Sequence, residues 1–402
     1  MYEKTQLDDV AGAGNGRGAW SHRAQQTATI KIGAITTLTG RQADFGKQQK
    51  TGFEVAIKEI NAKGGINGQK VELQLEDSAS DVNKGLAAAE RLVNAGVGVI
   101  INEYSSSIVK AQAQYLSRQK VPNIVVSSSD ESITKPGFDY VFRINPPTDK
   151  YAEVLFNVFT DMGIKTVAVL GGTGSFEKSV INSAIEQSAR TKLEIVASQT
   201  YDKGLTDFRP ILNGFKAKNP DAIFLVGYQE DSVGVMRQSK EVGLNPKIFA
   251  GAAAGFALPD FIKGAGSSSQ YVVTATAWVP QMKTPNNDKL YVKLVTGLGG
   301  QEPTYHAAQA YAGILVAADA IKRAGSGTDR EAINKALLST NLSTSYANIK
   351  FENFAGYKNQ NNLSMVAQQV QKIGNKLQFV PIYPKNLFTG KIEFPTPAWD
   401  KR

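Results

Sequence analysis

The sequence contains no cysteine, and only two of its 402 residues are histidines. The absence of cysteine excludes disulfide bonds, thiolate metal sites, thiol nucleophiles and lipid attachment through cysteine. His22 lies within residues 1–28, so His306 is the remaining imidazole for the body of the chain. Structural zinc sites are built from clustered Cys and His ligands, which this composition cannot supply. We therefore expect no metal and no cofactor.

The sequence also lacks long apolar runs and runs of like charge. No apolar stretch approaches the about 20 residues that cross a bilayer, so we expect no transmembrane helix. The formal net charge is +9 and the sequence pI is about 9.3, which raises the question of a nucleic-acid partner. The lysines are scattered singly, often near a glutamate, as is typical of solvated surfaces. We expect no nucleic-acid partner.

Motifs typical of enzymes are missing or incomplete. The sequence has no Gly-x-Ser-x-Gly motif, and we expect His306 to be a helix-end residue rather than a catalytic base. Gly40–Lys47 is too long between its glycines for a phosphate loop, and the dinucleotide-like segment Gly171–Gly174 is followed by Glu177 where the last glycine of the pattern should stand. Both segments are better explained as strand-to-helix turns. A carboxylate pair for glycoside chemistry stays open, since carboxylate separations are not visible in a sequence. We expect that the protein is not an enzyme.

The segment from Ile30 to Asp77 has the pattern of a βαβ unit. Ile30–Ile35 is a β-like run, and Val71–Leu75 alternates with the period of two that is typical of a strand. Between them, apolar residues recur at the spacing of one helix face, at Phe53, Ala56, Ile57 and Ile60. The loop after the first strand opens at the strand's C-terminal end, where open α/β sheets bind ligands.

Strand-like runs and helical patterns alternate from Ala28 onward and fall into two series of similar size. The first series ends at Asn145–Asp149, where two prolines interrupt it, and Trp278–Pro280 marks a second crossing point. We predict an α/β protein with two doubly wound, Rossmann-like lobes. Residues 1–28 are glycine-rich and lack the apolar core of a secretory signal, so we expect a disordered leader there.

Two serine clusters follow consecutive predicted strands. Tyr104–Ser107 comes after the strand that ends at Ile101, and Ser127–Ser129 comes after Ile124–Val126. Serine hydroxyls together with backbone N–H groups at a helix start form a receptor for a carboxylate without a buried cation. The alternative is that these serines only cap helices. Two clusters at adjacent strand ends favour a ligand site.

The second series has aromatic and acidic residues at its strand ends. Phe176 follows the strand that ends at Leu170, and Tyr228 and Glu230 follow Ala222–Val226. An aromatic wall and an acid opposite a serine cradle would suit a small amphipathic anion or a zwitterion. A tyrosine is also common in an ordinary core, so each aromatic residue alone carries little weight.

These segments together resemble the leucine/isoleucine/valine-binding protein family, the type I periplasmic substrate-binding proteins of amino acid and amide ABC transporters. The similarity spans nearly all of residues 29–400, and its most specific segments are Leu38–Gly46, Ile60–Gly68, Ser105–Ser107 and Tyr305–Tyr311. The resemblance implies two lobes joined by a three-segment hinge, with the ligand clamped between them. The implied division is 29–146 and 279–348 for the N-terminal lobe, and 147–278 and 349–398 for the C-terminal lobe.

The resemblance also implies which residues contact the ligand. The corresponding positions in this chain are Ser106, Ser127 and Ser129 at the ligand carboxylate, Tyr104, Ser105 and Ser128 along the same wall, and Phe45, Phe176 and Tyr228 as aromatic contacts.

The sequence departs from the family at the acid that pairs with the ligand's ammonium group in amino-acid-binding members. Here the corresponding strand is followed by Ala252–Ala254, with Ala253 at the ligand-facing position. An unpaired ammonium in a closed cleft costs roughly several kcal/mol. Either Glu230 or Asp231 therefore substitutes for the acid, or the ligand has no α-amino group.

The resemblance implies a substrate-binding protein that captures a small carboxylate, such as a branched-chain or related amino acid or amide, for an ABC transporter permease. It implies a periplasmic or extracellular location, and we expect a monomer. One alternative ligand is an aromatic or keto acid without an α-amino group, stacked by Trp278 and the aromatic positions. An alternative of another class is a ligand-sensing regulatory domain, although residues 1–28 cannot supply a helix-turn-helix.

Overall fold

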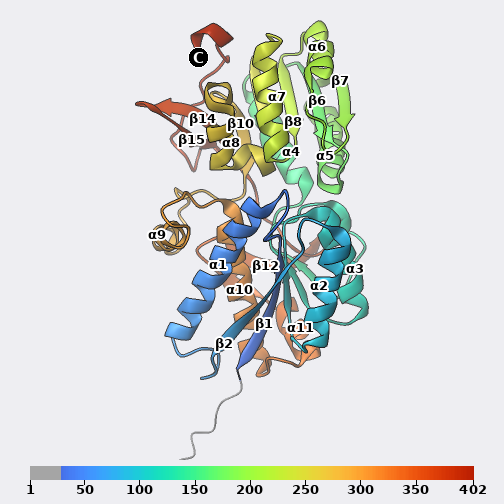
Figure 1. Cartoon of the computed structure of the whole chain (residues 1–402), viewed down its shortest axis with the longest axis vertical. Helices are drawn as coiled ribbons and strands as arrows, with labels where there is room; N and C mark the ends of the chain where they lie inside the picture. Colours follow the sequence, from blue (N-terminus) through green and yellow to red (C-terminus); the bar gives the residue numbers. More distant parts are fainter. Residues whose placement is uncertain (1–28) are drawn as a thin grey trace, which may run out of the picture.

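The computed structural model describes residues 29–402 and contains two α/β lobes arranged end to end (Figure 1). The leader expected at residues 1–28 lies outside the described residues. Each lobe has a central, largely parallel sheet with helices on both faces, so the predicted fold class is confirmed. Between residues 29 and 402, no helix combines the length and the apolar character needed to cross a membrane.

The first lobe is built on one mixed sheet. Its strands are β1 (Ile30–Thr36), β2 (Val71–Asp77), β3 (Ile100–Asn102), β4 (Asn123–Val125), β5 (Val141–Arg143), β11 (Asn341–Ser343), β12 (Asn348–Phe354) and β13 (Tyr357–Asn361). In the described part of the chain these strands form an eight-stranded sheet of order β11-β12-β13-β5-β4-β3-β1-β2. The strands from β13 to β2 run parallel, and β12 and β11 add antiparallel pairs at one edge.

Helices cover both faces of this sheet. They are α1 (Ala43–Ala62), α2 (Val82–Asn94), α3 (Ser106–Arg118), α9 (Asn287–Gly297), α10 (Tyr305–Ala324) and α11 (Arg330–Leu338). Successive side chains of a strand point to opposite faces, which assigns the two sides of β1 to different helices. Ile32 packs in a cluster with Phe53 of α1 and Ala310 of α10, whereas Ile35 packs with Leu92 of α2 and Leu116 of α3.

The second lobe repeats this plan. Its elements are α4 (Thr148–Asp161), β6 (Thr166–Gly172), α5 (Ser175–Thr191), β7 (Glu194–Tyr201), α6 (Arg209–Lys218), β8 (Ala222–Val226), α7 (Gln229–Glu241), β9 (Ile248–Gly251), α8 (Pro259–Ala265), β10 (Val273–Thr276), β14 (Val366–Ile373) and β15 (Lys376–Tyr383). Over residues 29–402 the sheet has the order β15-β14-β10-β9-β8-β6-β7, with β14 and β15 antiparallel at its edge.

The chain passes between the lobes three times, from β5 to α4, from β10 to α9 and from β13 to β14. The prediction that residues 349–398 belong to the C-terminal lobe is wrong for residues 349–361. β12 and β13 belong to the first sheet, where Gln360 of β13 pairs with Arg143 of β5. The third crossing between the lobes therefore follows β13. The prediction fails here because an alternating pattern identifies a strand but does not indicate which sheet the strand joins.

Candidate ligand site between the lobes

The segments that follow the strand ends of the two sheets meet at the junction of the lobes. Tyr104 lies two residues beyond the end of β3, and Tyr228 lies two residues beyond the end of β8. Their ring centroids are 6.0 Å apart. The carboxyl ends of parallel strands are the usual ligand-binding edge of open α/β sheets. Here the carboxyl-end edges of both sheets face the junction between the lobes.

The two serine turns lie side by side in the first lobe. The hydroxyl of Ser106, the first residue of α3, accepts hydrogen bonds from the backbone N–H groups of Ser129 (3.3 Å) and Asp130 (3.3 Å). Ser105 is the N-cap of α3, but its side chain makes no capping hydrogen bond. Hydroxyls, backbone N–H groups and the positive end of a helix dipole therefore converge at the start of α3, an arrangement suited to an anion.

The hydroxyls of Ser127–Ser129 are held by other protein groups. Their hydrogen bonds run from Ser127 Oγ to Gln309 Oε1 (2.7 Å), from Gln49 Nε2 to Ser127 Oγ (3.1 Å), from Ser128 Oγ to the Glu103 carbonyl (3.0 Å) and from Ser129 Oγ to the Tyr151 hydroxyl (2.8 Å). All three side chains are buried. These bonds fix the backbone of the second turn and thereby orient its N–H groups toward Ser106.

Aromatic rings from both lobes pack together next to the serine turns. Phe45 of α1 stacks on Tyr104 with a centroid distance of 4.2 Å and an angle of 21° between the rings. The imidazole of His306 lies 5.0 Å from the Phe45 ring at an angle of 78° between the ring planes. From the second lobe, Tyr228 lies 6.3 Å from Phe45, and Phe176 lies 6.3 Å from Tyr228. These distances are typical of favourable aromatic contacts, so the cluster joins the lobes.

Two further predicted positions, Trp278 and Ala253, lie in the segments that follow β10 and β9. Trp278 is buried in the second crossing segment, where its Nε1 donates to Asn287 Oδ1 (2.7 Å), so it supports the hinge. Ala253 follows β9 with φ 51° and ψ −135°, a conformation that L-residues rarely adopt. The strained turn brings the backbone close to Tyr228, since a Cβ built on Gly255 would lie 2.3 Å from the Tyr228 carbonyl carbon.

A cavity of about 240 Å³ lies between the lobes beside this cluster. Ser105 and Ser107 at the start of α3 line its first-lobe wall, and Glu177 and Tyr228 line its second-lobe wall. Among the predicted ligand contacts, Ser105, Tyr228 and Glu230 line this cavity. The other predicted contacts are buried in the aromatic cluster, in the serine turns or in the turn after β9.

Two ionisable side chains are fully enclosed near the aromatic cluster. Glu103 ends the β3 segment with both carboxylate oxygens buried and without a hydrogen-bond partner among residues 29–402, and burial raises the pKa of this carboxyl to about 8. His306 is 1% exposed, and burial lowers the pKa of its imidazole to about 3. At neutral pH Glu103 is therefore largely protonated and His306 is neutral, so neither presents a full charge to the site.

Charged side chains pair across the mouth of the cavity. Arg41 of the first lobe lies 2.5 Å from the Glu230 carboxylate and 3.9 Å from that of Asp231 in the second lobe. Asp231 Oδ2 also accepts a hydrogen bond from the Tyr228 backbone N–H (3.2 Å). Glu230 and Asp231, the two acids predicted as possible partners for a ligand ammonium group, thus already contact other groups of the protein.

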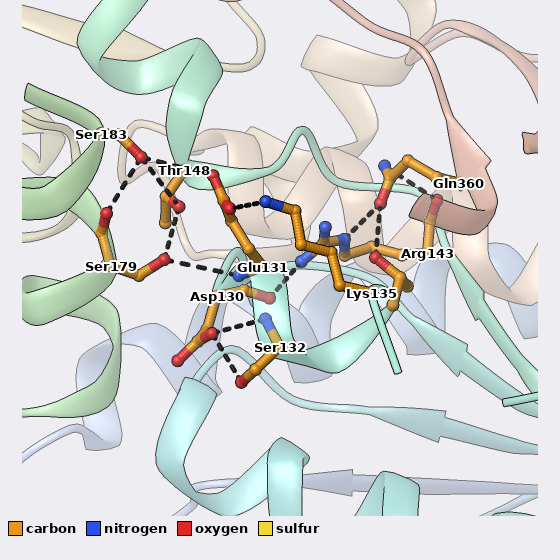
Figure 2. A network of polar contacts seen from close by, with 10 residues as sticks. Asp130, Glu131, Ser132, Lys135, Arg143, Thr148, Ser179, Ser183 and Gln360 are labelled. Carbon is orange, nitrogen blue, oxygen red and sulfur yellow. Dashed lines mark hydrogen bonds and ion pairs between the residues drawn. The ribbon is translucent and has the colours of Figure 1, made fainter. Parts of the chain in front are cut away.

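A second set of contacts between the lobes lies beside the hinge (Figure 2). The backbone N–H of Glu131 donates to Ser179 Oγ of α5 (3.4 Å). The fully buried Arg143 donates through Nη1 to the Asp130 carbonyl (2.7 Å) and through Nε to Gln360 Oε1. The loop after the second serine turn is therefore attached both to hinge strands β5 and β13 and to the opposite lobe.

The sequence analysis did not identify Glu177, Gln49 or Gln309 as part of this region. Gln49 and Gln309 lie on α1 and α10, and both are fully buried because they hold Ser127. Glu177 entered only as the residue that breaks a dinucleotide pattern. The sequence signal for Glu177 is its place next to Phe176, after a strand whose following loop is predicted to face the ligand.

The chain belongs to the periplasmic binding protein family, because the model of that family matches residues 29–375. The family consists of binding proteins rather than enzymes. Among curated proteins, the chain is 27% identical over 392 residues to Leu/Ile/Val-binding protein homolog 8 of Brucella melitensis, a match that covers 91% of this chain and 93% of the relative. It is 26% identical over 387 residues to Leu/Ile/Val-binding protein homolog 7 of Brucella suis, covering 92% and 96%.

Solved structures of ABC-transporter binding proteins share the fold. The leucine binding protein LivK of Thermotoga maritima superposes with a TM-score of 0.79 at 24% identity, covering 89% of this chain and all of that chain. A solute binding protein of Rhodopseudomonas palustris in complex with 3,4-dihydroxybenzoic acid gives 0.78 at 22% identity, covering 93% and 99%. The branched-chain amino acid binding protein LivJ of Streptococcus pneumoniae, in complex with isoleucine, superposes with a TM-score of 0.76 at 22% identity. The match covers 88% of this chain and all of that chain.

Proposed function

We propose that this protein is the substrate-binding component of an ABC importer and that it captures a small carboxylate between its lobes. The observation that carries the proposal is the cavity bounded by Ser105 and Ser107 at the start of α3 in one lobe and by Tyr228 in the other. The start of α3 supplies donors for a carboxylate, and the aromatic wall supplies apolar contact for the rest of the ligand. Family membership supports the transport role.

Closure of the lobes is the step that retains the ligand. A ligand that contacts both lobes stabilises only the form in which they meet, and hinge closure of this kind is the general behaviour of periplasmic binding proteins. The contacts between Arg41 and Glu230, and between Tyr104 and Tyr228, exist only with the lobes together. A permease then receives the ligand when the lobes separate. We place the protein in the periplasm or outside the cell, as a monomer with the permease as partner.

The residues around the cavity are compatible with two classes of ligand. A branched-chain or related amino acid or amide follows from the family resemblance. An aromatic or keto acid is favoured by Phe45, Phe176 and Tyr228 and by the absence of an acid in Ala252–Ala254. The structurally similar proteins bound to isoleucine and to 3,4-dihydroxybenzoic acid exemplify both classes.

A thermal-shift panel of amino acids, amides, keto acids and aromatic acids tests the proposal. A ligand at a hundred times its dissociation constant adds about 2.7 kcal/mol to the free energy of unfolding. Ser105→Ala should weaken the binding of any carboxylate hit by roughly 1–3 kcal/mol, because Ser105 lines the cavity and its hydrogen bond to the carboxylate is lost. Ser188→Ala on the outer part of α5, where the hydroxyl bonds only to the Ile185 carbonyl, is the matched control. Absence of stabilisation by every carboxylate would overturn the proposal.

A further inference from the structure

Glu177 has an unusual position for an acid in the first turn of a helix. It is the third residue of α5, yet it is only 5% exposed. Its carboxylate packs back against the turn after β6, since a Cβ built on Gly174 would lie 2.4 Å from Glu177 Oε2, and one built on Gly172 would lie 2.9 Å from Oε1. Both glycines thus leave the space that this carboxylate occupies.

No lysine or arginine of residues 29–402 forms an ion pair with the Glu177 carboxylate, and only the backbone N–H of Glu177 itself and the charge of Lys203 in the same cavity partly offset its burial. Oε2 is buried and has no hydrogen-bond partner among these residues. Arg41, at the mouth of the same cavity, is paired with Glu230. Burial raises the pKa of Glu177 to about 7, which reflects the cost of the unpaired charge. A buried carboxylate is ordinarily compensated by a cation or by donors.

The cavity gives Glu177 access to a bound molecule. Glu177 and Tyr228 line one wall, while Ser105 and Ser107 at the start of α3 line the opposite wall in the other lobe. The first-lobe wall therefore offers hydroxyl donors to an anionic group, and on the second-lobe wall, which also carries Lys203, Glu177 offers a carboxylate to a cationic group. A zwitterion that spans the cavity would satisfy both walls only when the lobes are together.

We propose that Glu177 binds an ammonium group of the ligand, so that the captured molecule is an amine-bearing carboxylate and not a simple aromatic or keto acid. This inference rests on the proposed function. Glu177 takes over the role of an acid that Ala252–Ala254 do not supply. Glu230 and Asp231 are less suited, because Glu230 is an exposed partner of Arg41 and Asp231 caps the backbone of Tyr228.

Matched pairs of compounds test this assignment by calorimetry on the whole chain. The pairs are leucine and 4-methyl-2-oxopentanoate, phenylalanine and phenylpyruvate, and 4-(aminomethyl)benzoate and 4-methylbenzoate. In at least one pair the wild-type protein should bind the amine-bearing member at least tenfold more tightly. Glu177→Gln, which keeps the shape of the side chain, should abolish this preference by weakening the amine-bearing member tenfold or more while changing the other member less than twofold.

Two further variants separate recognition from folding. Gly174→Ala leaves Glu177 chemically intact but adds a methyl group where its carboxylate lies, so it should also reduce the preference; the φ of −69° at Gly174 accepts alanine. Glu186→Gln on the exposed face of the same helix should change nothing. A wild-type protein that binds both members of each pair equally, or prefers the amine-free one, overturns the inference and leaves the proposed function standing. Retention of the preference by Glu177→Gln also overturns it, whereas failure of all six compounds to bind overturns both proposals.

Discussion

The Arg41 guanidinium and the Glu230 carboxylate, 2.5 Å apart, form an ion pair that joins the two lobes across the mouth of the cavity. Arg41 belongs to the loop between β1 and α1, and Glu230 belongs to the first turn of α7. Both side chains are partly exposed, at 36% and 68%, so solvent screens the pair. The pair therefore acts as a weak link that adds to closure without controlling it.

Neutralising this pair should weaken ligand retention in a salt-dependent way. Arg41→Gln and Glu230→Gln should each reduce the affinity for a hit from the thermal-shift panel by about two- to fivefold at low ionic strength. The double variant should lose no more than either single variant, because the same interaction is removed. In about 1 M salt the difference from the wild type should disappear. Calorimetry at both salt concentrations measures this, and an equal loss at high salt would show that the pair does not act through charge.

Glu103 should make the stability of the protein depend on pH. Its pKa is raised by burial from 4.5 to about 8 in the folded chain, so its stabilising contribution is complete below pH 4.5 and is lost as the pH rises through 8. Relative to the wild type, Glu103→Gln should therefore gain roughly 3 kcal/mol in the free energy of unfolding between pH 5 and pH 8. Urea denaturation at the two pH values measures the difference. A constant offset between the two proteins would contradict the assigned burial of the charge.

The turn after β9 should become more stable when its strain is relieved. Ala253 has φ 51° and ψ −135°, which glycine adopts without steric cost. Ala253→Gly should raise the free energy of unfolding by about 1 kcal/mol. Ala250→Gly, in the buried and regular strand β9, is the control and should lower it. If both variants lose stability to the same extent in chemical denaturation, the backbone at Ala253 is not strained.

The sequence predicts elements well where an apolar pattern and a capping residue agree. The segment Val82–Asn94 has a helical apolar pattern that predicts a helix, and it forms α2, whose N-cap Asp81 accepts a hydrogen bond from the Lys84 N–H. In contrast, α9 (Asn287–Gly297) was not anticipated. It buries few apolar side chains, and Val292 on its outer side is 62% exposed, so the helical pattern in that segment is weak.

The sequence predicts the side-chain contacts at the ligand site less well, and the physical reason is different. Strand ends locate the serine and aromatic segments, because the carboxyl ends of parallel strands share one edge. Side-chain partners depend on tertiary packing that periodicity does not encode. Ser127 bonds to Gln309, which is 182 residues away in the chain, and Glu177 is turned inward by the glycine turn before it. The sequence therefore indicated where a ligand site forms but not which polar groups remain available to a ligand.

The central claim is that the serine turn at the start of α3 binds a carboxylate between the lobes. Titration calorimetry with leucine and leucinamide, and with 4-hydroxybenzoate and 4-hydroxybenzamide, tests it most directly, in the wild type and in Ser105→Ala, which changes a residue that lines the cavity. We predict that at least one carboxylate binds ten times or more tightly than its amide, and that Ser105→Ala removes most of this difference. Equal affinity for both members of every pair would contradict the claim.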